Sequence, residues 1–136
     1  MTCAKGPLGV LESNPRYFTD GTGKAIYLTG SHTWANQNDH GASSPPPPFD
    51  FNTYLDFLQR FNHNFVRLRR KEVIVYSFPN GLGDLWINVG GPQPWPRTGP
   101  GLAKDGKPKF DLSQFDQAYF ARLRSRIIAA RDRGMY

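Results

Sequence analysis

The sequence predicts an α/β fold in which parallel strands alternate with helices that pack outside the sheet. Short runs of aromatic and β-branched residues alternate along the chain with two segments of helical periodicity, 50–62 and 111–133. The connections between these segments are richer in Gly and Pro than a helix or a central strand tolerates. Alternation of strand and helix is typical of a parallel sheet, so we expect parallel pairing between successive strands.

Composition limits the class of protein. With 136 residues, of which 38% are hydrophobic, the chain forms one domain at most. No run of eighteen apolar residues occurs and residues 1–9 lack the order of a secretory signal, so we expect neither a membrane-spanning helix nor a leader. The single cysteine, Cys3, excludes an internal disulfide and a thiolate zinc cage.

A β-hairpin is predicted over 15–30. Residues 16–19 and 25–29 are strand-like, and 20–23 between them supply two glycines for a tight reversal. Because the second run is apolar on consecutive residues, we expect a first strand covered on both faces that continues toward Trp34.

A helix is predicted over 50–62, after a loop over 36–48 that ends in four prolines. Asp50 can cap this helix, and the expected apolar face contains Tyr54, Leu55, Leu58 and Phe61. A second strand follows over 64–69, and then a long loop over 70–109 that contains many of the chain's Gly and Pro residues.

The second helix is predicted over 111–133. Asp111 is the expected cap with Gln114 three residues later, and Gly134 is the expected terminator. Phe120, Leu123, Ile127 and Ala130 form the expected apolar stripe, with solvated arginines on both flanks. Residues 135–136 begin a third strand, and we therefore expect 1–136 to be a fragment.

Several stretches resemble the start of glycoside-hydrolase-like (β/α)8 barrels, a group that includes cellulase-like and uncharacterised secreted proteins. The resemblance covers nearly the whole chain and rests on residues 14–20, 28–34, 64–68, 97–101, 105–111 and 115–120. It implies an N-terminal fragment of a (β/α)8 barrel with an initial β-hairpin, about two βα units and a long Gly/Pro-rich loop. Since a complete barrel has about 250 residues, 1–136 would be a partial barrel domain.

The same resemblance implies a parent enzyme that hydrolyses glycosidic bonds of a polysaccharide or oligosaccharide. Its two catalytic carboxylates would stand at the ends of the fourth and seventh strands, so the fragment itself is expected to be inactive. One departure is the run 69–72, Arg-Arg-Lys-Glu, where the resembled proteins carry a tryptophan-rich segment that ends in Glu.

His32 and Trp34 are the first candidates for a sugar-binding site. They lie two residues apart at the expected strand end, where barrels place their active sites. Trp offers a flat apolar face to a pyranose ring, and His can donate to a hydroxyl. The alternative is a hydrogen-bonded His and a packed Trp in the core.

Five further residues are candidates for substrate binding, namely Asn36, Asp39, Arg67, Glu72 and Trp95. Asn36 and Asp39 could extend a polar cleft, although such residues are also ordinary turn formers. Arg67 would face the barrel interior and need a carboxylate partner, for which Glu72 is nearest in sequence. Trp95 could line a glycan cleft or anchor the long loop.

We expect no cofactor and no metal, because the spacing of His32, Asp39 and His40 fits no known site. The expected partners are a carbohydrate substrate and the rest of the barrel. A non-catalytic carbohydrate-binding or pseudoenzyme unit is one alternative. A polyanion or nucleic-acid-binding module is another, suggested by the net charge of +6 but not by the scattered arginines of the second helix.

Overall fold

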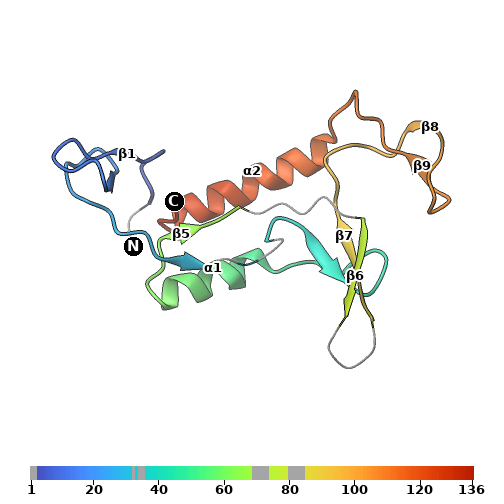
Figure 1. Ribbon diagram of the computed structural model, residues 1–136, viewed down its shortest axis with the longest axis horizontal. Helices are drawn as coiled ribbons and strands as arrows, with labels where there is room; N and C mark the ends of the chain where they lie inside the picture. The colour runs from blue at the N-terminus through green and yellow to red at the C-terminus, as the bar shows by residue number, and fades with distance from the viewer. Residues whose placement is uncertain (1–2, 32, 34–35, 69–73, 80–84) are drawn as a thin grey trace. The chain divides into compact units, whose positions relative to one another are not determined.

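The computed structural model describes residues 3–31, 33, 36–68, 74–79 and 85–136. Its element order is β1 (Gly9–Val10), β2 (Phe18–Thr19), β3 (Gly30–Ser31), β4 (Asp39–Gly41), α1 (Phe51–Arg60), β5 (Phe65–Val66), β6 (Val75–Pro79), β7 (Leu85–Gly91), β8 (Gly99–Leu102), β9 (Pro108–Lys109) and α2 (Gln117–Asp132) (Figure 1). The chain forms two compact units. The first contains Met1–Trp34, Asp50–Arg69 and Ser125–Tyr136, and the second contains Ala35–Phe49 and Arg70–Arg124.

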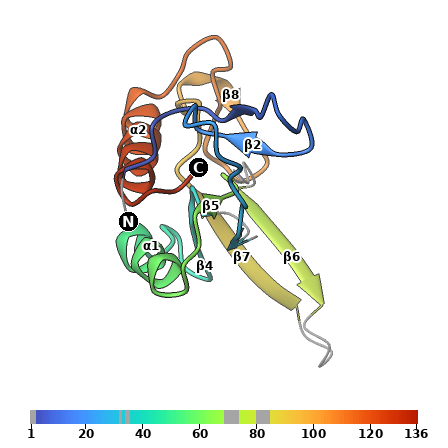
Figure 2. The same ribbon diagram turned by 90° about the vertical axis from the view of Figure 1, so that its left-hand side faces the viewer.

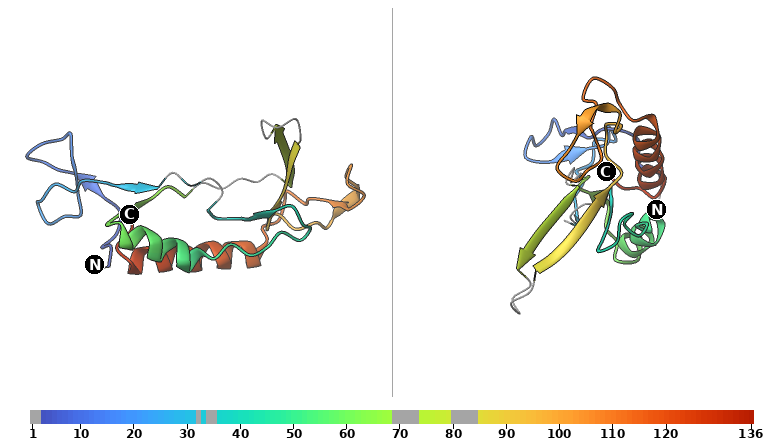
Figure 3. Two further views of the ribbon diagram at one scale, coloured as in Figure 1. Left: turned by 90° about the horizontal axis from the view of Figure 1, so that it is seen from below. Right: turned by 90° about the vertical axis from the view of Figure 1, so that its right-hand side faces the viewer.

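A parallel βαβ arrangement lies at the centre of the first unit. β3 and β5 pair in parallel, with Gly30 opposite Phe65, and α1 connects them (Figure 1; Figure 3, left). The backbone of Tyr136 continues the pattern, since its N–H donates to Asn64 O at 2.8 Å and its carbonyl accepts from Val66 N at 2.9 Å. These two bonds are those of parallel pairing with Phe65, so Tyr136 stands beside β5 as a third strand would.

Both helices end in the same capping motif before the chain enters this sheet. After α1, Asn62 has a φ of 57°, and His63 N donates to Leu58 O at 2.9 Å. After α2, Gly134 has a φ of 77°, and Met135 N donates to Ala130 O at 3.0 Å. A left-handed residue followed by a 6→1 bond is the Schellman motif. Gly134 therefore ends α2 as predicted.

The hydrophobic core of the described residues lies mainly in the first unit. α1 contributes Phe51, Leu55 and Leu58, and both leucines have 0% exposure. The helix begins as predicted, because the Asp50 side chain accepts from Thr53 N at 2.9 Å. The predicted apolar face of this helix is wrong at one position, because Phe61 is exposed. Phe51, which the prediction did not include, is buried.

The hairpin predicted over 15–30 is reduced to a single antiparallel bridge between Phe18 and Ile26. β2 pairs instead with β1 (Figure 2). The expectation of a strand covered on both faces is wrong, because the Tyr27 side chain is 80% exposed. Asn64 binds this segment to β5 by accepting from Thr29 N at 2.9 Å and donating to Tyr27 O at 3.0 Å.

The loops predicted over 36–48 and 70–109 contain strands, all of them in the second unit. β4, β7 and β6 form a three-stranded antiparallel sheet in that order (Figure 2). β8 pairs with β9 (Figure 1). The turn between β8 and β9 contains Gly106, which has a φ of 75°, whereas Gly99 and Pro108 lie inside short strands. The prediction of continuous loops over these ranges is therefore wrong.

The second helix starts six residues later than predicted. Asp111 accepts from Ser113 N at 3.0 Å in a local turn, whereas Asp116 accepts from Tyr119 N at 2.9 Å and caps α2. Phe115 and Phe120 then pack edge to face at 5.2 Å, which is the hydrophobic staple expected around such a cap.

Replacement of Asp116 with alanine should therefore destabilise the protein by about 1 kcal/mol, the usual value for loss of an N-cap. Thermal unfolding followed by far-UV circular dichroism at 222 nm measures this change. Asp111→Ala is the matched control and should leave the helical signal intact. If the Asp111 variant loses more helix than the Asp116 variant, the cap is assigned to the wrong residue.

The inward face of α2 carries arginines. Arg126 is only 8% exposed and lies 5.0 Å from the ring centre of Phe51. Arg133 Nε donates to Asp56 at 3.0 Å, and Gln59 donates to the Arg133 carbonyl at 3.3 Å. The prediction of solvated arginines is therefore wrong for Arg126, whose guanidinium lies over a ring of α1, whereas Arg124 and Arg131 are exposed as predicted.

Candidate functional site

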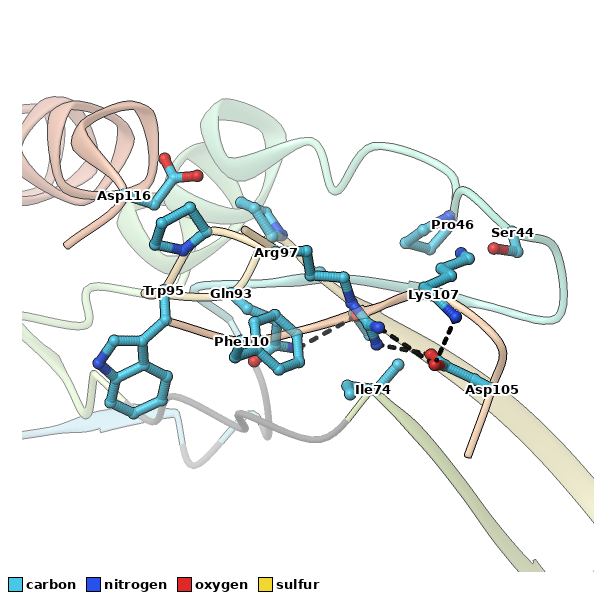
Figure 4. Close-up of a pocket in the computed structure, with 14 residues that line it drawn as sticks. Ser44, Pro46, Ile74, Gln93, Trp95, Arg97, Asp105, Lys107, Phe110 and Asp116 are labelled. Carbon is cyan, nitrogen blue, oxygen red and sulfur yellow. Dashed lines mark hydrogen bonds and ion pairs between the residues drawn. The ribbon is translucent and has the colours of Figure 1, made fainter. Parts of the chain in front are cut away.

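A pocket of about 400 Å³ lies in the second unit. Its walls combine aromatic rings, prolines and charged side chains (Figure 4). The lining side chains that carry chemistry are Gln93, Trp95, Arg97, Asp105, Lys107, Phe110 and Asp116.

The segment that carries Trp95 is fixed by backbone bonds on both sides of the tryptophan. The carbonyl of Pro94 accepts from Asp116 N at 2.8 Å, and the carbonyl of Pro96 accepts from Asp111 N at 2.9 Å. Both donors belong to the turn that leads into α2. The Trp95 backbone therefore has a set position before any ligand arrives, which lowers the entropic cost of binding.

The β8–β9 hairpin places two charged residues on another wall. Gly99 pairs with Lys109 and Leu102 with Pro108, and the turn closes with a 2.8 Å bond from Ala103 N to Lys107 O. Asp105 and Lys107 lie in this turn. The Asp105 carboxylate accepts from Lys107 N at 3.3 Å, as aspartates in turns commonly do.

Arg97 links the hairpin to the aromatic wall. Its guanidinium binds the Asp105 carboxylate with two bonds, of 3.1 and 2.5 Å, and donates to Pro108 O at 2.9 Å. The same group lies 4.4 Å from the ring centre of Phe110 (Figure 4). A bidentate pair stacked on an aromatic ring is rigid in comparison with an exposed single-contact ion pair.

Both carboxylates of the pocket already accept hydrogen bonds within the protein. Hydrogen bonds from Arg97 hold the pKa of the Asp105 carboxyl below its ordinary value, so Asp105 is ionised at neutral pH. Asp116 uses its side chain to cap α2. The arrangement is therefore one that binds polar ligands, with an aromatic surface, fixed donors and fixed acceptors.

Of the residues predicted from the sequence, Trp95 lines this pocket and is half-buried. Asn36 is 1% exposed and is not among the lining residues. Arg67 follows the last residue of β5 and is exposed, so its expected interior position is not observed. Three of the predicted residues, His32, Trp34 and Glu72, lie outside the described residues.

Asp39 has a structural role that the sequence did not indicate. Its carboxylate accepts two bonds from the guanidinium of Arg122, of 2.6 and 2.5 Å, and a third from Phe49 N at 2.8 Å. These bonds link Asp39 on β4 to the first turns of α2 and to Phe49, which follows the four consecutive prolines. The neighbouring amide of Asn38 also binds backbone, donating to Pro92 O at 2.9 Å.

Sequence reasoning missed Arg97, Asp105 and Phe110 as members of the site. They are separated by eight and five positions, which matches no helical or strand period. The usable signal was the turn sequence Asp105-Gly106, which closes a hairpin and brings an upstream arginine opposite the aspartate.

No group of three or more His, Cys, Asp or Glu residues that could hold a metal ion occurs in the described part of the chain. Across the same residues, no helix is both long and apolar enough to span a membrane. Comparison of the chain with protein families, with curated proteins and with solved structures finds no match.

Proposed function

We propose that this chain is the N-terminal part of a glycoside-hydrolase-like (β/α)8 barrel and that its pocket binds a sugar unit of a polysaccharide or oligosaccharide. The observation that carries the proposal is the pocket itself, whose lining includes Trp95 and the Arg97–Asp105 pair. Its volume of about 400 Å³ falls within the usual range of small-molecule sites, about 300–1,000 Å³.

The first unit supports the part of the proposal that concerns the barrel fold. Parallel strands with one helix between each pair are the repeat of a (β/α)8 barrel, and β3, α1, β5, α2 and Tyr136 follow that order. The repeated Schellman ending means that each helix returns the chain to the sheet in the same way.

The chemistry of the pocket supports the part of the proposal that concerns sugar binding. Pyranose rings present an apolar face that stacks on tryptophan, and hydroxyls that both donate and accept hydrogen bonds. In the pocket, Trp95 offers the aromatic surface, while Arg97, Asp105 and Gln93 offer polar atoms. Hydrolysis would depend on the carboxylates that the resemblance implies for the fourth and seventh strands of a barrel.

A non-catalytic carbohydrate-binding unit uses the same pocket and is the second candidate. The polyanion-binding alternative is less favoured, because three of the five arginines in and directly after α2 already have partners within the protein. Arg122 binds Asp39, Arg133 binds Asp56, and Arg126 stacks on Phe51. Paired and buried cations contribute little to the release of counterions that drives binding to polyanions.

Replacement of Trp95 with alanine should weaken sugar binding by at least about tenfold. The variant loses the free energy of one stacking contact between the indole ring and the sugar, and that free energy corresponds to about this change in affinity. The measurement is isothermal titration calorimetry of the full chain with oligosaccharides of glucose, xylose, mannose and galactose. Tyr27→Ala is the matched control, because Tyr27 is an exposed aromatic residue outside the pocket.

Two results would contradict the proposal. One is that the wild-type chain binds none of these oligosaccharides. The other is that it binds heparin with an affinity that Trp95→Ala does not change, which would favour the polyanion alternative.

A further inference from the structure

The Arg97–Asp105 pair retains hydrogen-bonding capacity on both partners. The observed bonds use three of the five N–H groups of Arg97, two toward Asp105 and one toward Pro108 O. Asp105 accepts from Arg97 and from Lys107 N. Among the described residues, its Oδ2 atom is bound only by Arg97 Nη2, so this oxygen keeps acceptor capacity. A donor on Nη2 and an acceptor on Oδ2 therefore lie next to each other.

From this juxtaposition we propose that the Arg97–Asp105 pair recognises two adjacent hydroxyls of an uncharged sugar ring. One hydroxyl oxygen accepts from Arg97, and the neighbouring hydroxyl donates to Asp105. The inference rests on the proposed function and specifies the class of sugar that the pocket takes.

The charge balance of the pocket selects against acidic sugars. Among the lining residues, Arg97 and Lys107 are cationic and Asp105 and Asp116 are anionic, so the charges balance. The Arg97 charge is already compensated by Asp105 at contact distance. A uronate or sulfate placed against the Asp105 carboxylate would meet its negative charge, and the adjacent Arg97 charge is already used by that carboxylate.

The pair is also held in place before binding. Stacking on Phe110 at 4.4 Å and the bond to Pro108 O fix the guanidinium, and the β8–β9 turn fixes the carboxylate. Fixed polar groups lose little conformational entropy when a ligand binds, so each bond contributes more to affinity. The fixed Arg97–Asp105 pair therefore favours ligands whose neighbouring hydroxyls match the distance between its donor and its acceptor.

The test compares matched sugars on the full chain by calorimetry. The probes are neutral oligosaccharides, the corresponding uronic-acid oligosaccharides, and forms of the best neutral ligand that lack one hydroxyl at position 2, 3 or 4 of the terminal ring. We expect uronates to bind at least about tenfold more weakly than the neutral forms. Loss of either of two neighbouring hydroxyls should weaken binding, while loss of the third should not.

The Asp105→Asn variant tests whether the Asp105 carboxylate binds the sugar or only stabilises the fold. The amide keeps the shape of the side chain but removes its charge and one acceptor. We expect neutral-sugar binding to fall about tenfold and the ratio of neutral to uronate affinity to narrow toward 1. Asp132→Asn removes the exposed Arg131–Asp132 pair outside the pocket and should change neither quantity.

The outcomes distinguish this inference from the proposed function. If wild type binds neutral and uronic sugars equally, or if Asp105→Asn lowers only stability and leaves the ratio unchanged, the recognition role of the pair is wrong while sugar binding stands. If no sugar binds at all, the proposed function fails. The deoxy-sugar series needs no variant, so it decides the question even if Asp105→Asn does not fold.

Discussion

Replacement of Gly30 with alanine is expected to destabilise the first unit by about 3 kcal/mol, at the upper end of overpacking effects. A Cβ on Gly30 would stand 2.0 Å from the carbonyl oxygen of Phe65 and 2.8 Å from its carbonyl carbon. Both atoms belong to the backbone of β5, so no side-chain rotation can relieve the clash. β3 and β5 would have to separate, and their parallel pairing would be lost.

The measurement is urea unfolding followed by circular dichroism, with Gly9→Ala as the matched control. Gly9 is also a strand glycine, but a Cβ there meets nothing within 4 Å. The control should stay within about 0.5 kcal/mol of wild type. Equal stability of the two variants would mean that β3 and β5 do not approach as closely as the structure places them.

Gly30 also illustrates what the sequence could reveal about the fold. The α/β class was predictable because it depends on local patterns: Asp50 before α1, the apolar spacing of Leu55 and Leu58, and Gly134 after α2. The register of β3 against β5 depends on a contact between residues 35 positions apart. No local pattern encodes that distance, although it is what makes glycine necessary at this position.

The face of α2 was mispredicted for a related reason. Hydrophobicity assigned the inward direction to Phe120, Leu123, Ile127 and Ala130, but Ile127 is exposed and Arg126 is buried. Arginine has a long apolar stem and a guanidinium that stacks on rings, so it can occupy an inward position where a partner such as Phe51 exists. Phe51 belongs to α1, and the periodicity of α2 alone cannot reveal a partner in another helix.

The candidate site was predictable only in part. Trp95 could be selected from the sequence because a tryptophan in a Gly/Pro-rich segment must either anchor that segment or bind a ligand. Its neighbours in the pocket depend on the β8–β9 turn, which brings Asp105 back toward Arg97. Asp39 was selected by its residue type and lies instead in an ion pair with Arg122.

Leu58→Ala should be as damaging as the Gly30 substitution, because it removes a side chain with no exposed surface from the core of the first unit. Truncation of a buried leucine costs about 2–5 kcal/mol, through lost burial and through the cavity that remains. Leu58 also supplies the carbonyl of the Schellman bond to His63, so the packing of this turn leads directly into β5. We expect a large fall in the free energy of unfolding in urea.

Phe57→Ala tests whether burial, and not the size of the lost side chain, determines this effect. Phe57 is the neighbouring residue on α1 and is larger than Leu58, but it is 53% exposed and its main ring contact is with the exposed Phe61 at 4.9 Å. Its truncation should cost less than about 1 kcal/mol. If Phe57→Ala proves the more destabilising variant, the buried face of α1 is assigned the wrong way round.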